Sequence, residues 1–108
     1  GDMKFLEEMI RLFIKSAEAG ISNIENAIVD ENREMVFENA HKMAAPAKHI
    51  GAKNIYNNIK KLENLANQDG NWKLIFTNFQ QIKKELTELN QLLNSYLLEI
   101  ETNHKFNF

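Results

Sequence analysis

Apolar positions recur every three or four residues through most of the chain, which is the spacing that places them on one face of an α-helix. The first such stretch covers residues 6–28, and Ser16 and Gly20 interrupt it. We therefore expect a short first helix, a bend near these two residues, and a second helix that ends before residues 30–32.

Two further apolar stripes follow this first stretch. Asn32 is a good N-cap for a helix whose stripe runs over residues 36–50 and which ends near Gly51. The next stripe covers residues 52–66 and closes at the turn of residues 68–71. Short connections of this kind join antiparallel neighbours in a helix bundle.

The last stripe, residues 75–100, is unbroken, and at about 1.5 Å per residue its helix would be on the order of 45 Å long. The fold class that we predict is all-α, an antiparallel four-helix bundle with a short additional N-terminal helix. Residues 3–101 would form the domain. Residues 102–108 have no period and are expected to fray, with Phe106 and Phe108 folding back on the bundle. Residues 1–2 are typical of an expression scar, so we expect a fragment of a longer protein.

Composition and charge narrow the classes of protein. The chain of 108 residues has no cysteine, which excludes disulfides and thiolate metal sites. Its apolar runs are too short for a membrane span or a signal peptide, so we expect a cytoplasmic domain outside the membrane. The net charge of −2 conceals a basic middle, since residues 41–84 carry two acids and eight bases. Such a block suggests an acidic or phosphorylated partner, although a solvated lysine-rich face has the same composition.

The basic block begins at a histidine, His41, that the helical wheel turns away from the core. With Val36 at zero, the apolar stripe of its helix lies within about 40° of one direction, whereas His41 lies at about 140° and Lys48 at about 120°. This excludes a core histidine and leaves an idle surface histidine as the alternative. Ala44 and Ala45, one turn on, leave room beside the ring and form a predicted docking face for another protein.

An exposed neutral imidazole is a good nucleophile near physiological pH. Metal binding is not expected, because His41 and His49 are about 12 Å apart along the helix and no acid pair completes a site. There is no glycine-rich loop for ATP and no motif around the serines, so we expect no kinase, ATPase or hydrolase activity of its own. We also expect no small-molecule substrate and no nucleic-acid partner. The natural role that is left is to receive a phosphoryl group from a protein.

Three short segments stand at a characteristic spacing: Ala40-His41, Ile50-Gly51-Ala52 and Lys60-Lys61-Leu62-Glu63. They resemble the signature of the histidine-containing phosphotransfer (HPt) domains of bacterial phosphorelays, in a variant form similar to modules of large hybrid sensor kinases of Bacteroidetes. The sequence departs from that signature after the histidine. The family's lysine is Ala44 here and its glycine is Ala45.

The resemblance implies that His41 is the phosphoacceptor, which takes the group from a receiver-domain aspartate of a response regulator and passes it to another receiver. It implies that this domain binds no cofactor and that the partner receiver supplies the Mg²⁺. Lys48 and Lys42 are candidates to lie near the phosphate in place of the family's lysine. Glu38, one turn before His41, either orients the imidazole or is a surface acid that pairs with Lys42. His49 is expected to be a bystander.

A different class of function stays open, namely a non-catalytic helical bundle for docking or dimerisation. The unbroken heptads of residues 75–100 and the missing lysine at Ala44 are the features that favour it. Pro46, inside the predicted helix of His41, lacks an amide N–H and leads us to expect a modest kink one turn beyond the histidine.

Overall fold

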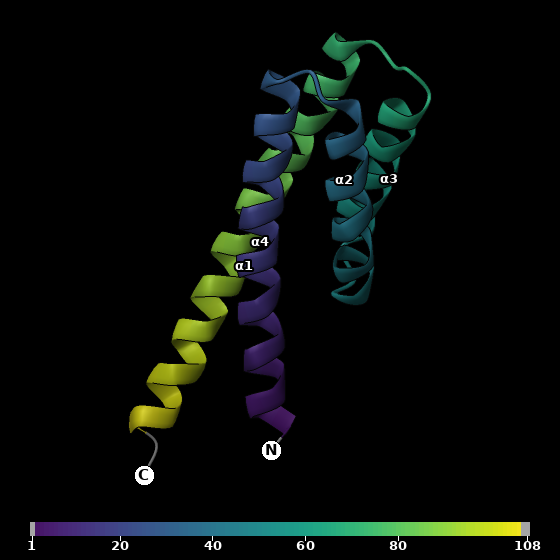
Figure 1. The fold of residues 1–108 in the computed structure, drawn as a ribbon. Coiled ribbons are helices and arrows are strands. Elements are labelled where there is room, and N and C mark those ends of the chain that lie inside the picture. Colours follow the sequence, from purple (N-terminus) through teal and green to yellow (C-terminus); the bar gives the residue numbers. More distant parts are fainter. Residues whose placement is uncertain (1, 107–108) are drawn as a thin grey trace.

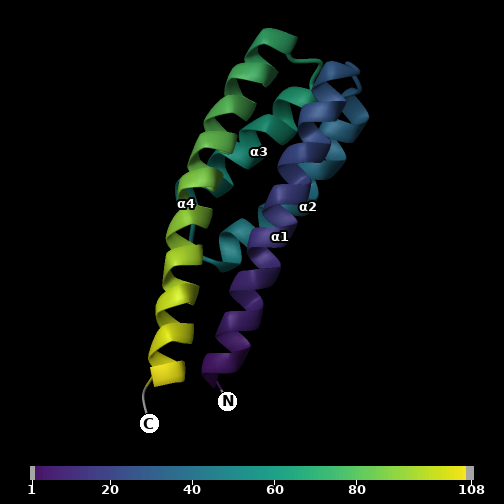
Figure 2. The ribbon, with the colours of Figure 1, turned by 90° about the vertical axis from the view of Figure 1, so that its left-hand side faces the viewer.

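The computed structural model describes residues 2–106, which form four α-helices. Their bounds are Asp2–Val29 for α1, Arg33–His49 for α2, Lys53–Asn67 for α3 and Trp72–Phe106 for α4. Figures 1 and 2 show α1 and α4 side by side, with α2 and α3 as a shorter antiparallel pair packed on the half that lies away from the termini. The predicted all-α antiparallel four-helix bundle is confirmed.

The first helix differs from the prediction, because residues 2–29 form one continuous helix of 28 residues where we expected a short first helix, a bend and a second helix. Gly20, where we expected a bend, is buried inside α1. A Cβ atom built on Gly20 would lie only 2.5 Å from Sδ of Met43 on α2. The glycine therefore marks the close approach of α1 and α2. The sequence alone does not distinguish this packing role from a bend.

Helix α2 begins and ends where the sequence predicts. The side-chain oxygen of Asn32 accepts a hydrogen bond from the backbone N–H of Met35 at 3.1 Å, as an N-cap does. After His49 the chain leaves the helix at Gly51, whose φ of +84° favours glycine. Pro46 lies inside α2, and the helix continues through it. The kink that we expected there stays a prediction.

The core has a large part and a small part. The large part fills the space between all four helices, and its largest fully buried side chains are Ile24, Val36, Ile59, Leu62, Ile75, Phe79, Ile82 and Leu86. The small part lies between α1 and α4 near the termini and consists of Ile10, Ile14 and Leu97. This second cluster lies beyond the ends of α2 and α3.

Helix α4 runs to Phe106, six residues beyond the end of the periodic stripe at residue 100. Residues 102–106, where we expected a frayed tail, are therefore helical in the structure. The predicted folding back of the two C-terminal phenylalanines lies outside the described side chains. The described bundle measures 57 × 20 × 19 Å. Within residues 2–106, none of the helices has both the length and the apolarity that a bilayer span requires.

Candidate functional site

His41 lies in the middle of α2 on the outside of the bundle, with 66% of its side chain exposed. The neighbouring Ala40 is fully buried, so the helix is anchored by the opposite face. The imidazole stacks on the ring of Phe37, one turn earlier, with centroids 5.9 Å apart and an angle of 13° between the planes. The predicted outward direction of His41 is confirmed.

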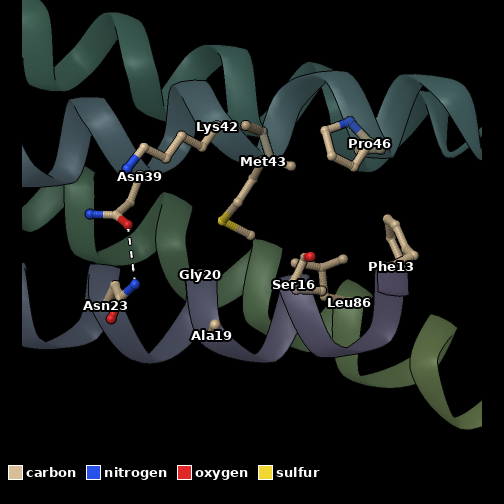
Figure 3. Close-up of a pocket in the computed structure, with 13 residues that line it drawn as sticks. Phe13, Ser16, Ala19, Gly20, Asn23, Asn39, Lys42, Met43, Pro46 and Leu86 are labelled. Atoms are coloured by element: carbon tan, nitrogen blue, oxygen red, sulfur yellow. Dashed lines mark hydrogen bonds between the residues drawn. The ribbon is translucent and has the colours of Figure 1, made fainter. Parts of the chain in front are cut away.

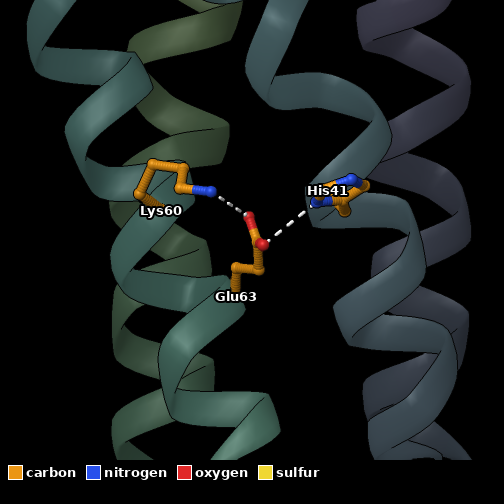
Figure 4. Close-up of polar contacts among 3 residues, drawn as sticks. All are labelled: His41, Lys60 and Glu63. Carbon is orange, nitrogen blue, oxygen red and sulfur yellow. Dashed lines mark hydrogen bonds and ion pairs between the residues drawn. The ribbon is translucent and has the colours of Figure 1, made fainter.

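A buried acid on the neighbouring helix holds the imidazole. Oε1 of Glu63, on α3, lies 3.0 Å from Nδ1 of His41. The other carboxylate oxygen, Oε2, accepts a hydrogen bond from Nζ of Lys60 at 2.9 Å. Figure 4 shows the Glu63 carboxylate between the two partners. Only 9% of the Glu63 side chain is exposed, so its position is fixed by packing as well as by these contacts.

The contacts of Glu63 decide its charge. Burial raises the pKa of the Glu63 carboxyl, but the hydrogen bonds from Lys60 and His41 and the positive charge of Lys60 outweigh it and hold the pKa below its usual range. The same hydrogen bond raises the pKa of Lys60. Glu63 is therefore an anion near neutral pH and Lys60 a cation.

An ionised carboxylate has no proton to donate, so Nδ1 of His41 must carry the proton of that hydrogen bond. In the neutral imidazole the other nitrogen, Nε2, then holds the free lone pair. Glu63 thus selects the tautomer in which the free lone pair lies on Nε2, the nitrogen that does not bond to Glu63. A carboxylate behind an imidazole plays the same orienting part in other histidine sites.

The sequence also predicts three charged residues near His41, namely Lys48, Lys42 and Glu38. Nζ of Lys48 lies 5.7 Å from the ring centre of Tyr56, over its face. Lys42 is one of the residues that line a cavity of about 310 Å³ between α1 and α2, together with Met43 and Pro46 (Figure 3). Glu38 is exposed, and among the described residues the carboxylate that bonds to the imidazole is not that of Glu38.

The predicted docking face needs one correction. Ala45 is exposed, as expected, but Ala44 is 7% exposed and belongs to the main core. At about 80° from the core direction it lies at the edge of the apolar stripe, and the approach of α3 covers this edge. A lysine at this position would have to extend out of the helix interface.

Glu63 and Lys60 are part of the segment Lys60-Lys61-Leu62-Glu63 that carries the resemblance, but the sequence did not predict their contacts at the site of His41. A signal was present, because Glu63 follows the stripe of Ile55 and Ile59 at the helical spacing of the buried face. A carboxylate at such a position is costly unless it is paired. This cost predicts that another side chain pairs with the Glu63 carboxylate. Which side chain that is depends on how α2 packs against α3.

Comparison with protein families gives a match to the family described as "Hpt domain" over residues 8–92. The matched segment includes all of α2 and α3, and with them His41 and Glu63. The chain belongs to the Hpt domain family. Hpt domains have a phosphotransfer role in two-component signalling, where they interact with receiver domains. The comparisons with curated proteins and with solved structures give no match.

Proposed function

We propose that this Hpt domain accepts a phosphoryl group on Nε2 of His41 from the phosphoaspartate of a receiver domain and then passes it to another receiver. The observation that carries the proposal is the exposed imidazole whose Nδ1 is bonded to a buried, ionised Glu63. This arrangement supplies an oriented lone pair on the side open to a partner.

The transfer step follows from the tautomer. The Nε2 lone pair attacks the phosphorus atom of the aspartyl phosphate, the N–P bond forms, and the bond from phosphorus to the aspartate oxygen breaks. The aspartate leaves as a carboxylate. The ring, now positively charged, keeps its Nδ1 proton against the Glu63 carboxylate, which stabilises that charge. The same step in reverse delivers the group to the aspartate of the next receiver.

Lys60 is the cation that takes the place of the family's lysine in this proposal. Its ammonium group bonds to Glu63, and Glu63 bonds to His41, so the three side chains form one network across α2 and α3. Lys60 fixes the carboxylate and adds positive charge beside the phosphoryl oxygens. Lys48 and Lys42 contribute at longer range. The receiver brings the Mg²⁺, and the exposed Ala45 leaves room for its approach.

The network also bears on the alternative of a domain that only docks. Docking does not require a buried carboxylate, which costs desolvation energy, directly behind an exposed imidazole. This chain has an alanine, Ala44, at the position of the family's lysine, but it keeps an acid and a cation around the histidine. Retained phosphotransfer explains this arrangement better than docking alone.

The proposal is tested with a panel of receiver domains, each phosphorylated with acetyl phosphate and mixed with the Hpt domain. We expect the wild type and His49→Gln to carry phosphate label that is acid-labile and base-stable, and His41→Gln to carry no label. His49 is the matched control, since it is an exposed histidine at the end of the same helix. Label that remains on His41→Gln, or no label on wild type with any receiver, would contradict the proposal.

A further inference from the structure

The half of the bundle near the termini has one side that nothing in the described chain covers. We call residues 3–14 of α1 and residues 90–103 of α4 the arm. Figures 1 and 2 show the arm extending beyond the ends of α2 and α3. Its two helices hold each other through the small cluster around Ile10 and Leu97 and an ion pair between Arg11 and Glu101.

The side of the arm that continues the α2 and α3 side of the bundle is apolar. On α1, the exposed Phe5, Met9 and Leu12 follow one another at helical spacing and lead to Ser16, which lines the cavity beneath α2. On α4, the exposed Leu92 and Tyr96 come seven and eleven residues after Glu85, which hydrogen-bonds to α3. We call these five exposed side chains, Phe5, Met9, Leu12, Leu92 and Tyr96, the uncovered face.

The uncovered face also joins a groove at the end of α2. This groove of about 300 Å³ lies between Met9 and Leu12 of the arm and Pro46, His49 and Ile50 at the end of α2. A helix that lies on the uncovered face would therefore have its end against the turn between α2 and α3. The layer formed by α2 and α3 ends at this turn. The apolar surface of α1 and α4 on which this layer packs continues past the turn as the uncovered face.

We infer that the uncovered face binds a second copy of this chain, so that two arms pack in antiparallel orientation around a two-fold axis. Each arm then packs on the uncovered face of its partner, which the partner's own α2 and α3 are too short to cover. The paired arms form a four-helix layer of their own, which is the packing that amphipathic helices of this kind favour. A parallel arrangement does not close, because the two α2–α3 pairs would meet first and hold the arms apart.

The size of the uncovered face fits a dimer interface. Its five side chains are 39% to 70% exposed, and at roughly 200 Å² for a large side chain they present on the order of 500 Å² of apolar surface. A specific interface buries about 800 Å² on each partner, polar rim included. The five side chains supply more than half of that area, and a single monomer surface rarely exposes a larger apolar patch.

Charge favours the same orientation. The arm carries Glu7, Glu8, Glu99 and Glu101 against Lys4 and Arg11, a net charge of −2. The turn between α2 and α3 is flanked by Lys48 and Lys53, a net charge of +2. Antiparallel packing brings the acidic arm of each copy to the basic turn of the other, which steers the association. His41 is two turns above the end of α2, about 12 Å away, so it stays accessible in the dimer.

The test is sedimentation velocity or light scattering on the full chain from micromolar to millimolar concentration. We expect the wild type to move from the monomer mass of 12.6 kDa toward twice that mass as concentration rises. Leu12→Glu and Leu92→Glu alter exposed positions, so the fold is kept, and each should raise the dimer dissociation constant at least about tenfold. Leu98→Glu is the matched control, because Leu98 is equally exposed on the arm but points to its other side.

A wild type that stays monomeric at millimolar concentration overturns the inference, and so does a Leu98→Glu variant that weakens the dimer as much as Leu12→Glu. If the wild type is monomeric and Leu12→Glu slows transfer from a receiver, the uncovered face belongs to the receiver and the dimer is rejected. Phosphotransfer to His41 does not require the dimer, so failure of this inference leaves the proposed function standing.

Discussion

At the scale of single residues, the site depends on one buried carboxylate. Glu63 bonds to both His41 and Lys60, and it links the imidazole on α2 to a cation on α3. The family's lysine is replaced by Ala44, which is buried against α3. In our proposal, Lys60 on α3 supplies the positive charge that α2 lacks at this position.

Replacing Glu63 by glutamine tests the choice of tautomer. The amide of Glu63→Gln can donate to Nδ1 of His41, which favours the proton on Nε2 and removes the attacking lone pair. We expect transfer from a phosphorylated receiver to slow at least about tenfold, with a matching change in the imidazole ¹⁵N shifts. Glu38→Gln is the control and should transfer at the wild-type rate. Equal rates for both variants would show that Glu63 does not orient the ring.

Replacing Lys60 by methionine tests the substitute cation. Lys60→Met keeps the length of the side chain but removes the charge beside Glu63. We expect transfer to slow by about three- to tenfold and the phosphohistidine to hydrolyse faster. Lys61→Met makes the same change at an exposed neighbour and should have little effect. If Lys48→Met slows transfer and Lys60→Met does not, then Lys48 is the cation at the phosphate.

At the scale of helices, the sequence predicts what depends on local spacing and misses what depends on packing between helices. The Asn32 cap, the end of α2 near Gly51 and the outward direction of His41 follow from neighbours in the chain. Gly20 and Ala44 do not, because Met43 and α3, which lie against them, come from other helices. For the same reason, residue types alone identify His41 as a site residue but not its bond to Glu63.

The N-cap of α2 gives a prediction at this scale. Asn32→Ala removes the acceptor of the Met35 N–H and should lower the free energy of unfolding by about 1 kcal/mol. For a domain of this size that corresponds to a Tm lower by roughly 5 °C. Thermal melts followed by circular dichroism check this, with Asn54→Ala, an exposed position in the first turn of α3, as control. A Tm loss no larger than the control's would mean that the cap contributes nothing.

At the scale of the whole molecule, the bundle is longer than a compact domain. Its radius of gyration is 15.7 Å, against about 13 Å for a compact chain of this length. The excess comes from the arm, most of which extends past the ends of α2 and α3. The main core, which supports His41 and Glu63, lies in the other half. The molecule thus separates the candidate phosphotransfer site from the surface that we assign to self-association.

The free energy of unfolding should depend on pH in the way that the lowered pKa of Glu63 requires. A carboxyl whose pKa is lower in the folded state adds stability above its unfolded pKa of about 4.3 and loses it as the pH falls through the folded value. The urea midpoint of the wild type should therefore fall more steeply, as the pH drops below about 5, than that of Glu63→Gln, which has no titrating carboxyl at position 63. Parallel pH profiles would mean that Glu63 is not an anion held by its partners.

The most direct test of the account is to find which atom of the phosphorylated domain carries phosphorus. The domain is labelled with ¹⁵N, phosphorylated by a receiver, and examined by NMR for coupling between ³¹P and the imidazole nitrogens. We expect phosphorus on Nε2 of His41, with the Nδ1 proton still bonded to Glu63. Phosphorus on Nδ1, or on any other side chain, would contradict it.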